Sequence, residues 1–185
     1  MLLGTVSCYK DNEIPETLSP MERWVGTWQV RRKNGNVDVI DNWKISVKEK
    51  DKTLRIIGLE GFTDLTRYDT EATVDENGDL IVKTQITGSY EDPEKGHVDL
   101  LLSGQYVNPA TGMLYYTSNI GVILMTGKLS EDGNSASLTP GDIKETQFRN
   151  FQFYGRYMYV SGNITGASFS AGPTALPNTM TRVLP

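Results

Sequence analysis

The stretch VGTWQV, residues 25–30, opens the first strand-like part of the chain, directly after a polar lead that contains Pro15 and Pro20. The glycine at position 26 permits a backbone conformation or a close approach that a Cβ atom would prevent. Trp28 and Val30 fall on the same side of such a strand, because strand side chains alternate between faces. A large indole on the inner side can fill one end of a closing sheet. The pattern predicts such a plug, with an ordinary core tryptophan as the alternative.

The composition favours one all-β domain. The chain has 185 residues, of which 18 are glycine and nine are tyrosine, and amphipathic helix periodicity is nearly absent. Lys and Arg number 18 against 23 Asp and Glu, and the basic residues are scattered. A nucleic-acid surface needs clustered basic residues, so we expect no nucleic-acid partner. No apolar run approaches the roughly 20 residues of a membrane-spanning helix.

Residue types that carry metal or cofactor chemistry are scarce. Cys8 is the single cysteine and His97 the single histidine, whereas zinc and haem sites usually need more ligands of that type. The sequence has neither a Gly-x-Ser-x-Gly elbow nor a phosphate-binding loop. We expect no enzyme, no catalytic residue, no metal site and no cofactor, and we interpret His97 as an exposed residue at a strand start. A glycosidase pair stays open, because the spacing of its carboxylates is spatial.

The clearest strand signal lies between residues 37 and 48. Apolar side chains occupy one parity of this stretch and polar side chains the other, which is the alternation of a half-buried strand. Trp43 belongs to the apolar set, and Asp41 faces inward with it. A carboxylate turned inward needs a partner or water. We therefore interpret Asp41 as lying at a barrel end, with a polar spot inside a cavity as the alternative.

About ten strand-like runs follow one another, and two of the turns that join them contain Asn-Gly. They cover residues 25–32, 37–48, 54–59, 67–74, 80–87, 97–107, 113–118, 121–129, 136–138, 148–160 and 178–184. This order predicts an antiparallel up-and-down meander. Residues 161–177, rich in Gly, Ala, Ser, Thr and Pro, are predicted to form a flexible loop. The final strand needs a sheet edge, and pairing with the first strand would close a barrel. A β-sandwich is the alternative fold.

Gly26, Trp28, the meander and an arginine on the final strand together resemble the lipocalin-like (calycin) β-barrels. In that family an arginine or lysine near the end of the last strand packs over the tryptophan of the first strand and closes one barrel end. The resemblance implies that Arg182 packs over Trp28, and that Gly26, Trp28 and Arg182 have structural rather than catalytic roles. A guanidinium on an indole face contributes about 0.5–2 kcal/mol.

A second resemblance concerns the start of the chain. The residues LGTVSC at positions 3–8 resemble the end of a bacterial lipoprotein signal, and the lysine and acidic residues at positions 10–13 resemble the export tag of surface lipoproteins in some Gram-negative bacteria. The resemblance implies a lipid anchor at Cys8, in the outer membrane of the cell envelope, with the domain at the cell surface. Residues 1–23 would then be a signal remnant and polar linker, and residues 24–185 the lipocalin-like barrel domain. The alternative is an incidental cysteine in a disordered tail.

The barrel prediction suggests a ligand. A barrel of eight or more strands can enclose a small molecule, so we predict a non-enzymatic protein that binds a small hydrophobic or amphipathic ligand within its barrel. The candidate ligand contacts combine aromatic side chains with one inward carboxylate: Asp41, Trp43, Tyr106, Tyr116, Phe151 and Phe153. The alternative role of these aromatic residues is to fill the core.

A different class of function also fits the sequence, namely a carbohydrate-binding or protein-interaction accessory module of a nutrient-uptake system. Exposed aromatic side chains would then stack on sugar rings or contact a partner protein, and the candidates are Tyr115, Tyr116, Tyr157 and Tyr159. Tyrosine is frequent in strands because of its β-propensity alone, so the sequence leaves both classes open.

Overall fold

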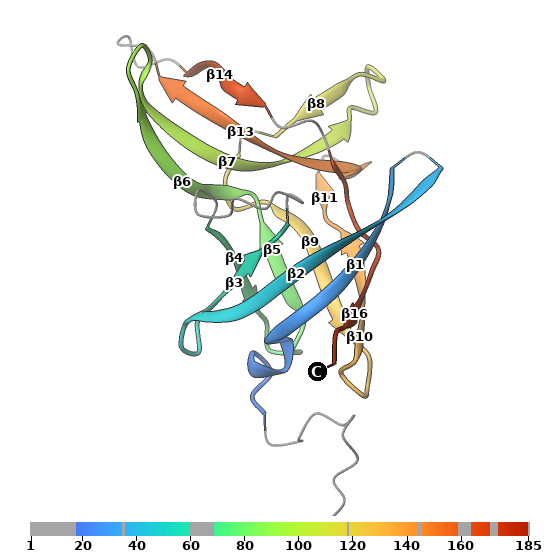
Figure 1. The fold of residues 1–185 in the computed structure, drawn as a ribbon. Coiled ribbons are helices and arrows are strands. Elements are labelled where there is room, and N and C mark those ends of the chain that lie inside the picture. Colours follow the sequence, from blue (N-terminus) through green and yellow to red (C-terminus); the bar gives the residue numbers. More distant parts are fainter. Residues whose placement is uncertain are drawn as a thin grey trace, which may run out of the picture.

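The computed structural model describes residues 18–34, 36–59, 69–117, 119–143, 146–158, 164–170 and 174–184. Cys8 and Tyr159 lie outside the described residues. Regular structure within them is strand, apart from the single-turn 3-10 helix η1 (Glu22–Trp24). No helix in these ranges is long and apolar enough to cross a membrane. Figure 1 shows two layers, a barrel and a second sheet that lies across one end of it.

Eight antiparallel strands close the barrel, each paired with its neighbours on both sides. In their order around the barrel they are β1 (Gly26–Asn34), β16 (Thr179–Arg182), β10 (Ser135–Pro140), β9 (Ile123–Leu129), β5 (Leu80–Lys83), β4 (Thr70–Val74), β3 (Thr53–Ile57) and β2 (Val37–Glu49). The all-β barrel is therefore confirmed, and the β-sandwich alternative is wrong. Closure also leaves no free edge among these strands, which removes the hazard of edge-to-edge association.

The first and last strands pair, as the sequence predicts. Trp28 lies opposite Arg182 in the β1–β16 register, and the guanidinium carbon lies 4.3 Å from the centre of the Trp28 ring. The guanidinium donates hydrogen bonds to the carbonyls of Val25 (2.6 Å), Arg23 and Gly133 (3.3 Å). Three backbone carbonyls and one indole face therefore fix the end of the last strand against the start of the first.

Gly26 and Trp24 complete this barrel end. Gly26 has a φ of +143°, and a Cβ atom there would lie 2.7 Å from an Arg182 nitrogen, so only glycine leaves room for the guanidinium. Trp24, on η1, is fully buried and lies 5.9 Å from Trp28, centroid to centroid. Its carbonyl accepts the indole N–H of Trp28 at 2.9 Å, and its own indole donates to the carbonyl of Gly78. Trp28 therefore shares the predicted plug with Trp24, which the sequence analysis missed.

The chain leaves the barrel twice to build the second sheet. After β5 it forms β6 (Gln85–Asp92), β7 (Gly96–Val107) and β8 (Leu114–Tyr116) before it returns as β9. After β10 it forms β11 (Asp142–Ile143), β12 (Thr146–Gln147), β13 (Asn150–Met158), β14 (Ile164–Ser170) and β15 (Thr174–Ala175), and it returns as β16. The second sheet has the order β14-β13-β7-β6, with β8 on β7 and β15 on β13, while β11 and β12 pair with each other.

Two expectations need correction here. The strands predicted at residues 97–107, 113–118 and 148–160 belong to the second sheet, so the meander is interrupted rather than continuous. Residues 164–170, predicted as part of a flexible loop, form β14 along the edge of β13. Their small-residue composition resembles that of a loop, but the β13 edge supplies hydrogen-bonding partners, and strand formation depends on such context more than on composition.

The barrel and the second sheet share one hydrophobic core. The buried cluster contains Trp28 and Trp43 from the barrel together with Phe151 and Phe153 from β13. Gly104, on β7, lies beneath Phe148, and a Cβ atom at this position would lie 2.4 Å from the Phe148 ring. The missing side chain therefore allows an aromatic ring to fill the space between the layers.

Replacement of Arg182 by alanine tests the barrel closure. We expect Arg182→Ala to lower the free energy of unfolding by roughly 2–4 kcal/mol, because it removes charge-assisted hydrogen bonds and the contact with the indole. Urea unfolding followed by tryptophan fluorescence would measure this change. Arg31→Ala is the matched control, since Arg31 is exposed in the same strand pair, and it should cost about 0.5 kcal/mol or less. Equal losses in both variants would contradict the closing role of Arg182.

Candidate functional site

Side chains fill the described interior of the barrel. Trp28 and Trp43 are directly paired across β1 and β2 and are at most 1% exposed. The other large side chains that line the interior are similarly buried: Val30, Ile45, Leu54, Ile56, Leu80, Val82, Met125, Leu138 and Met180. None of these residues exceeds 5% exposure, so the interior that they line offers almost no accessible surface. This agrees with the width of eight-stranded barrels, which is just enough for side chains to fill.

Asp41 lies at the barrel end and has a charged partner. Its carboxylate is 2.6 Å from Nε of Arg32, and the two side chains are 14% and 15% exposed. Its β1 partner, Val30, is one residue before the last β1–β16 pair, which joins Arg31 to Thr179, and β2 pairs with β3 only from Lys44 onward. Asp41 thus lies near the end of both pairings, which agrees with the barrel-end interpretation. The ion pair satisfies the carboxylate without a ligand.

The aromatic residues predicted on the second sheet mostly belong to the core. Phe151 and Phe153 lie edge to face with a centroid distance of 6.3 Å, and Tyr106 meets Phe148 edge to face at 6.2 Å. Tyr106, Phe151 and Phe153 share one buried cluster with Trp43 and are at most 5% exposed. A ligand could touch these four predicted contacts only after displacing packed side chains. The remaining predicted contact, Tyr116, lies elsewhere.

Tyr116 belongs to an exposed apolar surface around β8, which we call the β8 corner and define as Met113, Leu114, Tyr116 and Ile120. Their exposed fractions run from 41% to 61%. β8 pairs with β7 on one side and lies at one end of the second sheet (Figure 1). A contiguous group of large exposed apolar side chains usually marks an interaction surface. The predicted exposure of Tyr115 and Tyr116 is confirmed, whereas the side chain of Tyr157 lies outside the described parts of the structure.

A row of hydrogen-bonded side chains runs from β13 to β8, and we call Asn150, Gln105 and Tyr116 the amide–tyrosine row. Asn150 pairs with Gln105 across β13 and β7, and Gln105 pairs with Tyr116 across β7 and β8. Side chains of residues paired in this way project from the same face of a sheet. The Asn150 amide donates to Oε1 of Gln105 at 2.6 Å, and the Gln105 amide donates to the Tyr116 hydroxyl at 2.7 Å. The row thus joins a buried amide to the exposed β8 corner.

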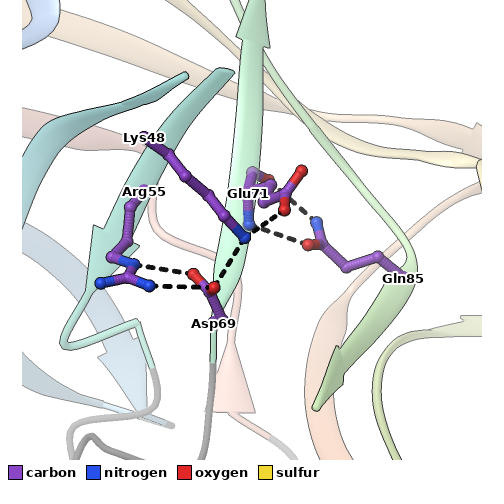
Figure 2. A network of polar contacts seen from close by, with 5 residues as sticks. All are labelled: Lys48, Arg55, Asp69, Glu71 and Gln85. Atoms are coloured by element: carbon purple, nitrogen blue, oxygen red, sulfur yellow. Dashed lines mark hydrogen bonds and ion pairs between the residues drawn. The ribbon is translucent and has the colours of Figure 1, made fainter.

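A second polar cluster lies on the outer wall of the barrel (Figure 2). Arg55 binds both carboxylate oxygens of Asp69, at 2.8 and 3.0 Å. Lys48 lies between Asp69, at 2.6 Å, and Glu71, and it donates to both. Gln85 exchanges two hydrogen bonds with the backbone of Glu71, at 2.8 and 2.9 Å. Because Gln85 begins β6, its amide holds β4 at the point where the chain leaves the barrel for the second sheet.

The charges of this cluster suit a structural role. The Arg55 guanidinium, with a further contribution from Lys48, lowers the pKa of Asp69 from 3.8 to about 2. Asp69 therefore stays ionised at neutral pH and cannot donate a proton as a general acid. The same contacts raise the pKa of Lys48, chiefly through its hydrogen bond with Asp69. Sequence analysis missed this cluster because its members come from four strand regions that become neighbours only in the folded sheet.

His97 lies at the start of β7, as expected, and its side chain is 60% exposed. The hydrogen bond with Glu91, at 2.9 Å, raises the pKa of His97, and Asp99 lies 3.4 Å from the other ring nitrogen. Asp99 is also paired with Arg156 at 3.1 Å. Within the described residues, no group of three or more His, Cys, Asp and Glu side chains has a geometry that could hold a metal ion.

Comparisons of this chain with protein-family models, with curated proteins and with solved structures each gave no match. The likeness to lipocalins therefore rests on the architecture, a closed antiparallel barrel of eight strands with an arginine over a tryptophan at one end. This architecture is compatible with a lipocalin-like fold.

The stabilising role of the outer cluster can be tested through its acid dependence. A carboxylate whose pKa falls on folding stabilises the protein above its ordinary pKa, here 3.8, and this contribution disappears as the pH falls toward about 2. Asp69→Asn should lower the free energy of unfolding at neutral pH by roughly 1 kcal/mol, because solvent screens this partly exposed pair. The difference from wild type should vanish near the lower pH, as measured by urea unfolding across this range.

Asp38→Asn is the matched control for this measurement, because the Asp38 carboxylate is 74% exposed and lies 4.0 Å from Lys33. Its stability should follow that of the wild type at every pH. A difference between Asp69→Asn and wild type that persists unchanged at the lowest pH would show that lost packing, rather than charge, explains the effect.

Proposed function

We propose that this protein is a non-enzymatic binding module whose ligand docks on the β8 corner. The observation that carries this proposal is the contrast between the two surfaces that could bind. Side chains at the β8 corner are 41–61% exposed, although they are large and apolar, whereas the lining of the barrel is at most 5% exposed. Exposed apolar area is available to a ligand without any rearrangement, and its burial is favourable.

The binding of a small hydrophobic or amphipathic molecule inside the barrel stays a prediction. Such binding would require the packed side chains around Trp28 and Trp43 to move apart and leave space. Interiors are close-packed, and the loss of contacts in a newly opened cavity costs free energy. The observed burial therefore favours the second class of function, an accessory module that contacts a carbohydrate or a protein at a surface.

We further propose that the domain is tethered to the outer membrane of a Gram-negative cell through a lipid on Cys8, as the resemblance of residues 3–8 implies. The arrangement of the fold supports this orientation. The described chain enters through η1 at the barrel end that holds Trp24 and Arg182, and the second sheet lies across the other end (Figure 1). A tether that precedes η1 would leave the β8 corner pointing away from the membrane, where a surface module meets its ligand.

The position of the ligand can be tested by NMR on protein with labelled Ile, Leu and Met methyl groups. The probes are lauric acid, lysophosphatidylcholine and a set of neutral oligosaccharides. A probe that binds should shift the methyl signals of Met113, Leu114 and Ile120, and should leave those of Leu54 and Met180 in place. Shifts confined to the interior methyl groups would refute docking at the β8 corner and would support the barrel-interior ligand.

The lipid anchor has a separate test. The full chain, expressed with its own N-terminus in a Gram-negative host, should enter the membrane fraction with the mass of a lipid-modified cysteine at position 8. Cys8→Ala should appear in the soluble fraction and lack that added mass, because the acceptor thiol is absent. Cys8→Ser is the closest control in size and should behave like the alanine variant. Membrane association that survives both changes would contradict lipidation at Cys8.

A further inference from the structure

We propose that the amide–tyrosine row makes the β8 corner a site for a neutral carbohydrate chain, an inference that rests on the proposed function. The row offers directed hydrogen-bonding groups, and the corner beside it offers an exposed aromatic ring. These are the two features that recognise a pyranose ring, which has hydroxyl groups around its edge and C–H groups on its faces.

The direction of the hydrogen bonds sets what the row can offer to a ligand. Asn150 donates to Gln105, and Gln105 donates to the Tyr116 hydroxyl. Since this hydroxyl already accepts a hydrogen bond, its own proton is available to a ligand. At the other end, the side-chain carbonyl of Asn150 accepts no hydrogen bond from any residue that the structure describes. The row thus presents one donor and one acceptor at its opposite ends, on strands β8 and β13 that lie on either side of β7, about 10 Å apart. This spacing suits hydroxyl groups on successive rings of a glycan chain.

The central residue of the row is held rigidly. Gln105 is 4% exposed, and both ends of its amide are occupied by neighbours in the row. A buried amide with its hydrogen bonds satisfied has little freedom to rotate, so the Tyr116 hydroxyl is fixed before a ligand arrives. Such preorganisation reduces the entropic cost of binding.

The apolar part of the site lies on the same face of the sheet. Leu114 and Tyr116 alternate with Tyr115 along β8 and are 57% and 41% exposed. The negative face of an aromatic ring attracts polarised C–H groups such as those of a sugar ring. Tyr115 points to the other face, where it stacks on Tyr106 at a centroid distance of 6.1 Å. Of the two tyrosines, Tyr116 is therefore the one on which a sugar ring can stack beside the row.

The charge of the site favours a neutral glycan. The row contains no carboxylate, ammonium or guanidinium group, so a charged ligand would gain no ion pair from it. A protein partner could also cover the apolar corner, but it would not need a fixed donor and acceptor beside an exposed ring. The arrangement of the polar groups therefore favours the glycan over a protein.

Affinity electrophoresis provides the test, with native gels that contain a soluble β-glucan, a xylan, a galactomannan or, as the acidic comparison, polygalacturonate. At least one neutral polysaccharide should retard the wild-type protein. Tyr116→Ala should weaken that binding about tenfold or more, in line with the loss of one stacked ring. Tyr116→Phe keeps the ring but removes the hydroxyl, and it should weaken binding severalfold. Asn150→Ala, on the other end of the row, should also weaken it.

Tyr115→Ala is the matched control, because Tyr115 neighbours Tyr116 on β8 with nearly the same exposure, 40% against 41%, but projects from the opposite face. It should bind within about twofold of wild type. Urea unfolding would establish that each variant is folded, and Asn150→Ala reports on the row if Tyr116→Ala is unstable.

Four results would overturn the inference: no retardation by any neutral polysaccharide, retardation by polygalacturonate alone, equal weakening by Tyr115→Ala and Tyr116→Ala, or retardation that neither Tyr116→Ala nor Asn150→Ala changes. In the first two cases the proposed function is still supported if the lipid probes of the NMR experiment shift the methyl signals of the β8 corner. The last result would mean that the glycan binds at another surface. It would therefore also contradict the proposed docking of the ligand at the β8 corner.

Discussion

The guanidinium of Arg182 against the face of Trp28 is the contact on which the rest of the structure depends. It joins the last described strand to the first, and its hydrogen bonds to backbone carbonyls leave little freedom at this end of the barrel. Once β1 and β16 are paired, the eight strands have no free edge. The close approach requires a glycine at position 26, since any Cβ atom there would meet the guanidinium. A small set of residues far apart in the sequence thus establishes the closed topology.

Closure of the barrel leaves the two excursions of the chain to form a layer of their own. The second sheet does not fold as a separate unit, because Phe151 and Phe153 share their buried cluster with the tryptophans of the barrel. Its other face carries polar residues such as Gln105 and Asn150, which are joined by a hydrogen bond. Leu101, Ser103 and Gln105 on this face are at most 4% exposed, whereas Leu114 and Tyr116 at its β8 end are 57% and 41% exposed. The interior of the barrel, filled by its own side chains, contributes stability to both layers.

The polar clusters serve different purposes according to their position. Lys48, Arg55 and Asp69 satisfy one another on the barrel wall, and the low pKa of Asp69 follows from that pairing. Their charges are matched within the protein, so the cluster has little to offer a ligand. In the amide–tyrosine row, by contrast, the hydrogen bonds run in one direction and leave a donor on the exposed Tyr116. A cluster with unused hydrogen-bonding capacity at the surface is the more informative one about function.

Alternation along residues 37–48 and the Asn-Gly turns predicted an all-β fold, and the sheet edge that the final strand needs predicted closure with the first strand. These features are local or periodic, and they follow from the geometry of a strand. The contact between Arg182 and Trp28 was implied by the resemblance to lipocalin-like barrels. The division of the strands between two sheets, the conversion of residues 164–170 into β14, and the exposure of Tyr116 while Tyr106 is buried depended on tertiary structure. Each of these features depends on which sheet edge is free and on which face another layer covers. Contacts between residues that are distant in the chain decide both. The patterns in the sequence therefore determined the kind of fold, and the family resemblance implied its closing contact, whereas the tertiary structure alone decided which aromatic side chains a ligand can reach.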